Sequence, residues 1–351
     1  MDRFNLGKQC YDLKNDGFTN AQIVDKLDLS GDRRVRELVS YYTNISNAPP
    51  IYIINQSKRL DDSVPRAVAV EEIEETDLQQ FIQFGENFSE EYMRVAVLND
   101  IHFPDHEAYA LEIVLKVLHD FRPHIIQDGS DVFDFSEFSR WPQTSFDAIH
   151  QAYEETMEPY KNWRGMLHQA VPNHRAFFMP GNHDIRYLNY VIEKFPQIYY
   201  KERTNFIQDI RRTGTWWFGE KRDIITVGQL AIVHGSVAGK NPAKALWDRI
   251  GFNYQITVAG HVHRRSMYEQ TGYLEDSLTG IARFKTRVAA TTGCLCKQRP
   301  SYNQSHIGQN WSHGFALATV DHKTGEVIGF DNIEIDPVEW RCVFGGKVYK
   351  S

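Results

Sequence analysis

Short apolar runs, each followed by a polar turn, recur from the first third of the chain onward. They are too short for helices and are bounded by turn residues, which predicts buried β-strands. The runs are Val95–Leu98, Ile125–Ile126, Phe177–Met179, Leu230–Val233 and Ile256–Val258. Because loops at strand ends converge into clefts in α/β folds, the polar residues after these runs are expected to meet in one site.

The first 45 residues show a different spacing of apolar positions. Three short stretches, with Gly17 after the first, have the spacing of short helices. Thr19 or Asn20 can cap the second helix. The tight turn before the third gives the length of a helix-turn-helix, so residues 1–45 are expected to form a separate domain.

Residues 46–91 join this unit to the rest of the chain, and they begin with Pro49 and Pro50 before a strongly acidic stretch. Prolines and clustered like charges are typical of linkers. The apolar patches Ile51–Ile54 and Ala67–Val70 can add edge strands to the main sheet. The main domain is then expected over residues 92–340, with a C-terminal tail at 341–351.

Composition narrows the class of protein. A chain of 351 residues with 42% hydrophobic content can bury one core of ordinary domain size and leave a smaller unit over. The sequence shows neither an apolar signal region nor a run of eighteen apolar residues, so a cytoplasmic protein without a membrane partner is expected. The net charge of −7 argues against a general affinity for polyanions, although a cation-filled cleft binds phosphate locally.

The cysteines indicate neither a disulfide framework nor a structural zinc site. They are too few and too scattered, and they lack tetrahedral zinc spacing. They are Cys10, Cys294, Cys296 and Cys342, and reduced, buried thiols are expected at all of these positions.

Metal-ligating side chains follow each of the five apolar runs. Aspartate, asparagine and histidine suit Mn, Fe, Zn and similar divalent ions, and no cysteine lies in these turns. Two cations about 3.5–4 Å apart need roughly six ligands, including a carboxylate that touches both. The donors lie in Asp100–His102, Gly129–Asp134, Gly181–Asp184, His234–Gly235 and Gly260–His263. Together these segments indicate a two-metal hydrolase.

The five segments resemble, in order, the five signatures of calcineurin-like metallophosphoesterases. The matching sequences are Asp100-Ile-His102, Asp131-Val-Phe-Asp134, Gly181-Asn182-His183-Asp184, Val233-His234-Gly235 and Gly260-His261-Val262-His263. The resemblance covers roughly residues 93–320. It implies an α/β fold of two packed mixed β-sheets flanked by helices, with the metal site in loops along one edge of the sandwich.

The resemblance also implies two cation sites that share Asp131 as a bridge. The remaining ligands of one site would be Asp100, His102 and His263. The remaining ligands of the other would be Asn182, His234 and His261. The expected cofactors are two divalent metal ions, with Mn first and Fe, Zn, Ni or Mg as alternatives.

His183 holds no metal in this scheme; the family gives it the role of protonating the leaving oxygen or stabilising the phosphoryl transition state. Asp134 resembles the residue that orients this histidine, so an Asp134–His183 hydrogen bond is expected. The implied reaction is an in-line attack on phosphorus by a metal-bridging hydroxide. Arg186 and Arg264 follow ligand motifs and can meet the substrate phosphate, with solvated charges as an equal alternative.

Ser130 stands where the family usually has glycine, directly before the bridging aspartate. If the turn needs a positive φ there, serine costs roughly 1 kcal/mol, and Gly129 can take the bend instead. Asp128 is a rival bridging ligand. Asp131 is preferred because only it keeps the spacing to Asp134.

The N-terminal unit resembles the resolvase-like helix-turn-helix class. In that class the last helix enters the major groove of DNA, and here it would present Arg33, Arg34 and Arg36. Acidic neighbours such as Asp32 and Glu37 nearly cancel these charges. Protein docking or a purely structural role is therefore as well supported as DNA binding.

The metal motifs alone do not choose a substrate, because the same site serves phosphatases, nucleases and phosphodiesterases. Phe135-Ser136 and Asp184 stand where protein Ser/Thr phosphatases usually have Arg-Gly and Glu, which disfavours that class. The last motifs resemble the phosphodiesterase and repair-nuclease branch, and Gly235–Lys244 and Gly293–Cys296 look like phosphoesterases of bacteriophages. A phosphodiesterase or nuclease acting on DNA or nucleotides is the leading expectation.

Two alternatives stay open. One is a phosphomonoesterase for a small molecule or phosphoprotein, in which Trp216, Trp217 and Phe218 would wall a narrow cleft, although such spacing is more typical of a core. The other is a DNA-binding adaptor whose phosphoesterase domain is inactive, and its only support in the sequence is Ser130.

Overall fold

The computed structural model describes residues 3–36, 38–39, 53–54, 68–138, 153–219, 224–235, 239–275, 282–298 and 310–351. The chain divides into two compact units, residues 1–49 with 269–287 and residues 50–268 with 288–351. The domain boundary expected between residues 45 and 46 lies outside the described residues.

The N-terminal part is helical. Its helical residues lie in α1 (Arg3–Asn15), in α2 (Asn20–Leu27) and at 32–36 and 38–39. Thr19 caps α2 in a capping box with Gln22, which satisfies backbone N–H groups at the helix start. Among the described residues of this part, the fully buried apolar side chains are Cys10, Ile23, Val35 and Leu38. The three apolar stretches thus pack on one another, as their spacing predicts.

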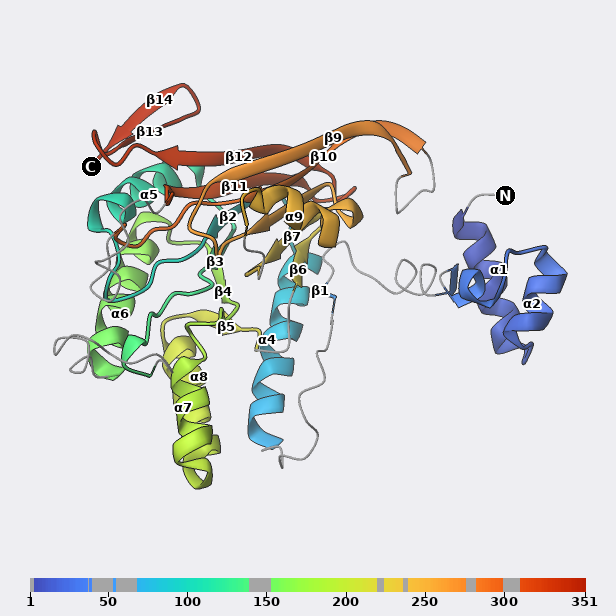
Figure 1. Cartoon of the computed structure of the whole chain (residues 1–351), viewed down its shortest axis with the longest axis horizontal. Coiled ribbons are helices and arrows are strands. Elements are labelled where there is room, and N and C mark those ends of the chain that lie inside the picture. The colour runs from blue at the N-terminus through green and yellow to red at the C-terminus, as the bar shows by residue number, and fades with distance from the viewer. Residues whose placement is uncertain are drawn as a thin grey trace. The chain divides into compact units, whose positions relative to one another are not determined.

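The strands form two mixed six-stranded sheets (Figure 1), ordered β12-β11-β2-β3-β4-β5 and β1-β6-β7-β8-β10-β9. Neighbouring strands from β2 to β5 run parallel, as do β7, β8 and β10. The strands are β1 (Ile53–Ile54), β2 (Tyr92–Leu98), β3 (Ile125–Asp128), β4 (Arg175–Phe178), β5 (Thr215–Trp217), β6 (Ile224–Val227), β7 (Leu230–Val233), β8 (Ile256–Ala259), β9 (Ser266–Glu275), β10 (Ala282–Thr291), β11 (His313–Asp321) and β12 (Val327–Ile335). All five strands predicted from the apolar runs are present.

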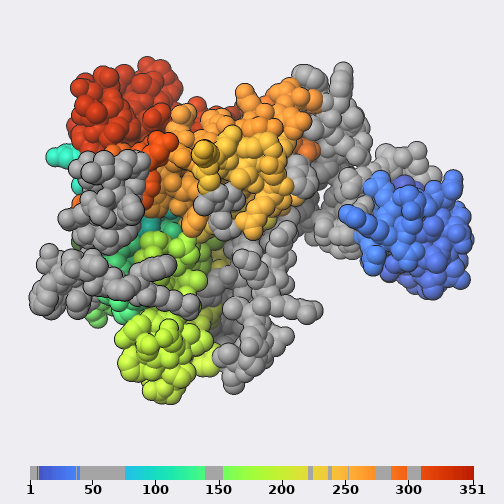
Figure 2. Space-filling model, in the orientation of Figure 1, coloured from blue at the N-terminus to red at the C-terminus, as the bar shows by residue number. Residues whose placement is uncertain are grey.

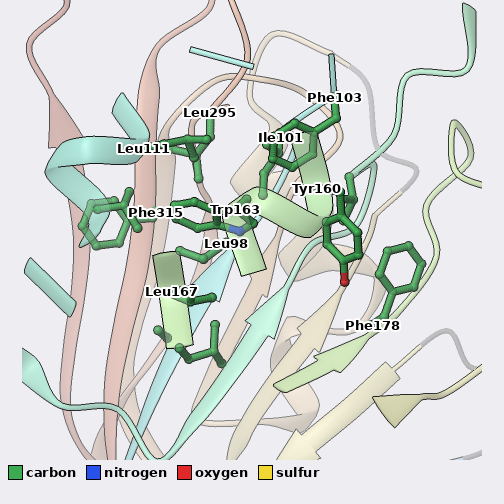
Figure 3. Close-up of a cluster of buried hydrophobic side chains, with 14 of the residues drawn as sticks. Leu98, Ile101, Phe103, Leu111, Tyr160, Trp163, Leu167, Phe178, Leu295 and Phe315 are labelled. Atoms are coloured by element: carbon green, nitrogen blue, oxygen red, sulfur yellow. The ribbon is translucent and has the colours of Figure 1, made fainter. Parts of the chain in front are cut away.

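Alternate residues of the central strands enter different cores, as the two-residue period of a strand requires. Val95 and Val97 of β2 point into the core between the sheets, whereas Ala96 and Leu98 point into the core beneath the helices. Figure 3 shows Leu98 in that second core together with Tyr160 and Trp163. The helices of this unit are α4 (Val68–Glu86), α5 (Ala108–Phe121), α6 (Tyr153–Ala170), α7 (Arg186–Lys194), α8 (Tyr199–Arg212) and α9 (Pro242–Arg249), with 3-10 turns η1 (Ser136–Phe138), η3 (Pro196–Ile198) and η4 (Gly251–Asn253).

The layers confirm the expected α/β sandwich. Helices α5, α6 and α8 contribute to the core on the outer face of the first sheet. Leu246 and Trp247 of α9 pack on the outer face of the second sheet. Among the described residues, no helix is long and apolar enough to cross a membrane.

Helix α4 corrects the prediction that residues 46–91 are a linker. Phe81 of this helix is fully buried in the core between the sheets. Asp77 accepts a hydrogen bond from the Trp217 backbone N–H at 2.8 Å and pairs with Arg211 at 3.0 Å. A buried aromatic side chain and a paired carboxylate hold the helix in place, even though its sequence is acidic overall.

Two smaller expectations about this region have opposite outcomes. Ile53–Ile54 pairs with β6 as an edge strand, as predicted. The strand expected at Ala67–Val70 is wrong, because residues 68–70 are helical.

In the described part of the chain, Trp216 and Trp217 of β5 and Phe218 directly after it do not wall a cleft. Trp217 and Phe218 are buried in the two cores. Trp216 donates a hydrogen bond from Nε1 to Gln80 of α4 at 3.0 Å. The bulk of these side chains closes the sandwich and its junction with α4.

The C-terminal residues form a hairpin where a tail was predicted. Strands β13 (Arg341–Phe344) and β14 (Lys347–Lys350) pair antiparallel and form part of the red surface at the upper left of Figure 2. Gly345 and Gly346 have φ of 56° and 76°, the left-handed pair that a tight two-residue turn requires. Tyr349 packs into the helix-side core and donates to Asp120 of α5 at 2.9 Å.

Candidate metal centre

The predicted metal donors gather at the carboxyl ends of parallel strands. Asp100 and His102 follow β2, Asp131 and Asp134 follow β3, Asn182 and His183 follow β4, His234 follows β7, and His261 and His263 follow β8. Two compact groups of ligand atoms, each within 4.8 Å, have Asp131 in common: Asp100, His102 and Asp131, and Asp131, His234 and His261. The structure therefore brings together donors separated by up to about 160 residues in the sequence.

The first half of the centre is fully enclosed. Asp100 and His102 are 0% exposed and His263 is 6% exposed. The Nε2 atoms of His102 and His263 lie 3.1 Å apart, and His263 Nε2 lies 3.4 Å from Asp100 Oδ1. Two imidazole nitrogens that bind the same cation, each at about 2.1 Å, lie roughly 3 Å apart. This spacing fits a shared divalent cation.

The tautomer of His102 agrees with that role. Its Nδ1 lies 3.2 Å from Asp134 Oδ1. An ionised carboxylate only accepts hydrogen bonds, so Nδ1 carries the proton and Nε2 presents its lone pair to the site. Burial lowers the pKa of His263, but the charge of Asp100 outweighs this and raises that pKa to about 9. A proton thus occupies the place that a cation would take.

The second half of the centre is more open. Asn182 is exposed, and His234 and His261 are half-buried. His234 Nε2 lies 2.9 Å from Asn182 Oδ1 and 3.3 Å from Asp131 Oδ2. His234 Nδ1 is buried and, within the described residues, lacks a hydrogen-bond partner. Burial lowers the pKa of His234, but Asp131 raises it to about 9.

Most of the donor residues sit in the left-handed backbone region. The five are Asp100 (φ 54°), His102 (54°), Asp131 (57°), His261 (72°) and His263 (53°). Each costs roughly 1–2 kcal/mol for a residue with a Cβ atom. Such strain persists only where surrounding bonds hold it, and it concentrates at functional sites.

Hydrogen bonds between the loops supply that support. Asp100 N donates to Ser130 O at 2.9 Å, and His102 N donates to Asp131 O at 3.1 Å. His261 N donates to both carboxylate oxygens of Asp100, at 3.0 and 2.8 Å. The turns after β2, β3 and β8 therefore fix one another.

Asp184 ties the turn after β3 to the turn after β4, a role that the sequence did not show. Its Oδ2 accepts from the N–H groups of Asp131 at 2.8 Å and Gly181 at 2.7 Å, and its Oδ1 accepts from Phe133 N at 2.8 Å. Burial and the charge of Asp131 raise the pKa of Asp184 to about 7, and the backbone donors oppose this shift. A Cβ atom on Gly181 would lie 2.2 Å from Asp131 Oδ1, so only glycine permits this approach.

The expected hydrogen bond between Asp134 and His183 is present. Asp134 Oδ1 lies 2.8 Å from His183 Nδ1. Burial raises the pKa of Asp134, but hydrogen bonds from His102 and His183 hold it well below its usual range. One carboxylate thus orients both a metal-centre imidazole and the predicted catalytic imidazole.

The two predicted substrate arginines have different surroundings. Arg186 lies against the predicted catalytic pair, His183 and Asp134. Its NH2 is 2.9 Å from His183 Nε2, and its NH1 donates to the Asp134 carbonyl oxygen at 2.8 Å. It is therefore not a free solvated charge. Arg264 is half-buried and donates to the Gly239 carbonyl oxygen. Of Arg33, Arg34 and Arg36 in the N-terminal helices, Arg34 is half-buried and the other two are exposed.

The turn before the shared carboxylate answers the question raised by Ser130. Gly129 has a φ of 99° and takes the bend, whereas Ser130 has no positive φ and donates from Oγ to Met179 O at 3.0 Å. Asp128 accepts from Trp163 Nε1 and pairs with Arg164, each at 3.0 Å. Asp128 is therefore committed to the helix-side core, and Asp131 is the carboxylate between the two groups of donors.

A thiol that no sequence motif predicts lies beside the proposed donors. Cys296 Sγ lies 4.0 Å from His263 Nδ1, and all four cysteines are free and buried. Cys296 forms a further compact group with His102 and His263. Its segment lies after β10, outside all five motifs, so only the folded chain shows the contact.

The family model for calcineurin-like phosphoesterases matches residues 93–265. The chain therefore carries a calcineurin-like phosphoesterase domain, the family of its five motifs. Among solved structures, Vps29 of Entamoeba histolytica, complexed with zinc, is 14% identical over 74% of this chain and 97% of its own, with a TM-score of 0.31. Vps29 of Chaetomium thermophilum is 10% identical over 74% and 98%, with a TM-score of 0.36. No curated protein matches the chain.

Proposed function

We propose that this protein is a dinuclear-metal-dependent phosphoesterase that hydrolyses phosphodiesters, with DNA or nucleotides as substrates. The observation that carries the proposal is the position of Asp131. Its carboxylate belongs to both groups of donors, and its Oδ2 lies 3.3 Å from His234 Nε2. A carboxylate shared by two donor groups is the arrangement that a pair of divalent cations requires.

The donor set defines which residues would hold each cation. Asp100, His102, Asp131 and His263 form the buried set, and Asp131, Asn182, His234 and His261 form the open set. When bound, the cations supply an acidified nucleophile and neutralise charge on the phosphoryl oxygens. Oxygen and imidazole donors favour Mn, with Fe, Zn, Ni or Mg as alternatives.

His183 and Asp134 handle the proton of the leaving group. Asp134 fixes the ring of His183 through Nδ1, which leaves Nε2 as the atom that faces an ester oxygen. An imidazole held in this way can protonate a departing alkoxide near neutral pH. His183 belongs to neither group of donors around Asp131, so this nitrogen is free of metal in the proposed reaction.

A DNA substrate also fits the helical N-terminal part of the chain. We propose that Arg33, Arg34 and Arg36 contact DNA phosphates or guanine edges and so hold the substrate. The adaptor alternative loses its only support, because Gly129 leaves the turn at Ser130 unstrained. The phosphomonoesterase alternative loses its aromatic wall, because Trp217 and Phe218 are core residues.

The first test compares two chromogenic esters with protein stripped of metal and reloaded with Mn²⁺. Turnover of bis-p-nitrophenyl phosphate that disappears in Asp131→Asn is the expected result. Turnover of p-nitrophenyl phosphate alone would move the proposal to a phosphomonoesterase. Turnover of neither ester by the reloaded protein would contradict a general phosphoesterase.

A further inference from the structure

Arg186 occupies the position from which His183 would serve an ester. The NH2 group of Arg186 lies 2.9 Å from His183 Nε2. A guanidinium group only donates, so Nε2 accepts this hydrogen bond and carries no proton. The proton of the neutral ring is then on Nδ1, which lies 2.8 Å from Asp134 Oδ1. In this arrangement His183 cannot pass a proton to a leaving group.

The bonds that hold Arg186 are modest for an arginine. Its NH1 group donates to the Asp134 carbonyl oxygen at 2.8 Å and lies 3.5 Å from Asp134 Oδ1. Among the described residues, it makes no bidentate pair with a carboxylate, which is the strongest arrangement available to this side chain. Its exposed fraction of 23% also leaves space for the side chain to turn.

The carboxylate of Glu137 would be a stronger acceptor for the Arg186 guanidinium than the groups that it contacts now. Glu137, in the turn η1, has both carboxylate oxygens buried, and among the described residues neither accepts a hydrogen bond from another residue. Burial and the charge of Asp134 raise the pKa of Glu137 to about 7, and the charge of Arg186 lowers it. A buried carboxylate without a partner is costly, and a cation that docks on it removes that cost.

The two elements that carry these side chains pack together. Phe138 of η1 has its ring centre 5.1 Å from that of Tyr187 and 5.2 Å from that of Tyr190, both on α7. Arg186 is the first residue of α7, and Glu137 is the middle residue of η1. The packing keeps the two side chains on neighbouring elements, and the charge of Arg186 acts on the Glu137 carboxyl.

We infer that Arg186 is a mobile cap on His183 and that the buried carboxylate of Glu137 receives its guanidinium while an ester occupies the site; this inference rests on the proposed function. When Arg186 leaves, His183 Nε2 takes up a proton from solvent. The resulting N–H donates to the ester oxygen that takes the place of Arg186, and it passes the proton to that oxygen as the P–O bond breaks. The salt bridge to Glu137 replaces the bonds that Arg186 gives up. Glu137 is thus a positioning residue, which acts on the reaction through Arg186.

The test uses two diesters with leaving groups of different basicity. Bis-p-nitrophenyl phosphate releases a stable phenolate, whereas a dithymidine phosphodiester releases an alkoxide that needs a proton. Glu137→Gln keeps the shape of the side chain and removes its charge. We expect kcat/KM for the dithymidine ester to fall about tenfold or more, with the p-nitrophenyl diester changed by less than about twofold.

Removal of the Arg186 guanidinium should restore the hydrolysis of the dithymidine ester that Glu137→Gln loses. In Glu137→Gln combined with Arg186→Met, the dithymidine ester should be hydrolysed as fast as in Arg186→Met alone, because no guanidinium covers His183. Glu193→Gln, a change of the same kind on the exposed side of α7, is the matched control and should match wild type. A double variant as slow as Glu137→Gln would overturn the inference, since a structural defect at Glu137 would not be rescued.

A second measurement separates this inference from the proposed function. The Nε–H signal of Arg186 is followed by ¹⁵N NMR in Zn²⁺-loaded protein, and inorganic phosphate is added as the probe. The signal is assigned by its absence from the spectrum of Arg186→Met. Phosphate should shift the wild-type signal to a position that Glu137→Gln does not reach. An identical shift in both proteins would mean that phosphate itself takes the guanidinium, and the inference would be wrong whether or not any ester is hydrolysed.

Discussion

The two halves of the metal centre use similar donors but are supported very differently. In the buried half, His102 is fixed by Asp134 at 3.2 Å, and His263 has Cys296 Sγ 4.0 Å from its second ring nitrogen. In the open half, the second ring nitrogen of His234 has no partner among the described residues, and Asn182 is exposed. Ligands whose outer atoms are fixed bind a cation with less loss of freedom. In the proposed two-metal reaction, this difference predicts that the buried half holds its cation tightly and that the open half exchanges its cation.

The largest expected effect comes from a change that removes what the halves share. Asp131→Asn should abolish binding of the second cation and weaken binding of the first, so kcat/KM should fall by about 10³-fold or more. Metal content per chain and hydrolysis of bis-p-nitrophenyl phosphate are measured on the same sample. Asp248→Asn, an exposed change of the same kind on α9, should behave as wild type. Two cations retained in Asp131→Asn would show that Asp131 is not the bridge.

The halves should respond unequally to loss of one imidazole each. His102→Ala opens the buried half and should lower the affinity for the more tightly bound cation roughly 100-fold. His261→Ala should weaken only the looser cation, because Asp100, His102 and His263 are untouched. Calorimetric titration of metal-free protein with Mn²⁺ resolves the two binding steps. Equal losses in both variants would remove the distinction between the halves.

Without metal, both halves should lose stability as the pH rises. His263 and His234 have their pKa raised to about 9 in the folded protein by Asp100 and Asp131, against about 6.5 in the unfolded chain. A raised pKa gives stability that is complete below pH 6.5 and is lost as the pH rises through 9. A rise in pKa from about 6.5 to about 9 corresponds to about 3.5 kcal/mol, at about 1.4 kcal/mol per pKa unit, and screening should reduce the contribution of each histidine to roughly 2 kcal/mol.

Urea unfolding of metal-free protein from pH 6 to pH 9.5 measures this decline. His263→Asn and His234→Asn should each flatten the curve. Protein loaded with Zn²⁺ should show little decline, since the cation replaces the protons. A flat curve for metal-free wild type would contradict the charge arrangement.

The smallest expected effect is at the thiol beside the buried half. Cys296→Ala removes the sulfur near His263 Nδ1 and should lower the affinity for the more tightly bound cation about tenfold. This is the smaller end of the loss expected when a metal ligand loses a neighbour that orients it. Cys296→Ser should keep part of that affinity, because serine retains an acceptor. The d–d spectrum of Co²⁺-loaded protein reports the change in the ligand field. Identical spectra in wild type and Cys296→Ala would show that the thiol does not orient His263.

The sequence predicted which side chains meet at the strand ends, because each of the proposed donors lies shortly after a short apolar strand. That information is local, and the parallel order of β2, β3 and β4 then brings the ends together. The link between Asp184 and the turn after β3 could not be predicted in this way, because it depends on contact across about 50 residues. The same holds for Cys296, whose distance from His263 is set by the packing of β10 beside β8.

Two wrong predictions about the fold concern segments whose sequences do contain the pattern of the observed structure. In α4, Asp77 and Phe81 are four residues apart, the spacing of one helical face, but the surrounding acidic residues favoured a linker. At the C-terminus, Gly345-Gly346 between two short alternating stretches is a hairpin pattern. No sequence pattern predicts the buried carboxylate of Glu137, since its environment is set by Asp134 and by Arg186, which is distant in the sequence.

The left-handed backbone of the donors has a consequence for how this protein can change. Glycine adopts a φ of 72° without cost, so His261→Gly should make the metal-free fold more stable by about 1 kcal/mol, while the backbone N–H still reaches Asp100. The same change deletes a ligand. Improvement of the fold and preservation of its chemistry therefore pull in opposite directions at this position. A laboratory selection for heat resistance that ignores turnover would be expected to erase the donor itself.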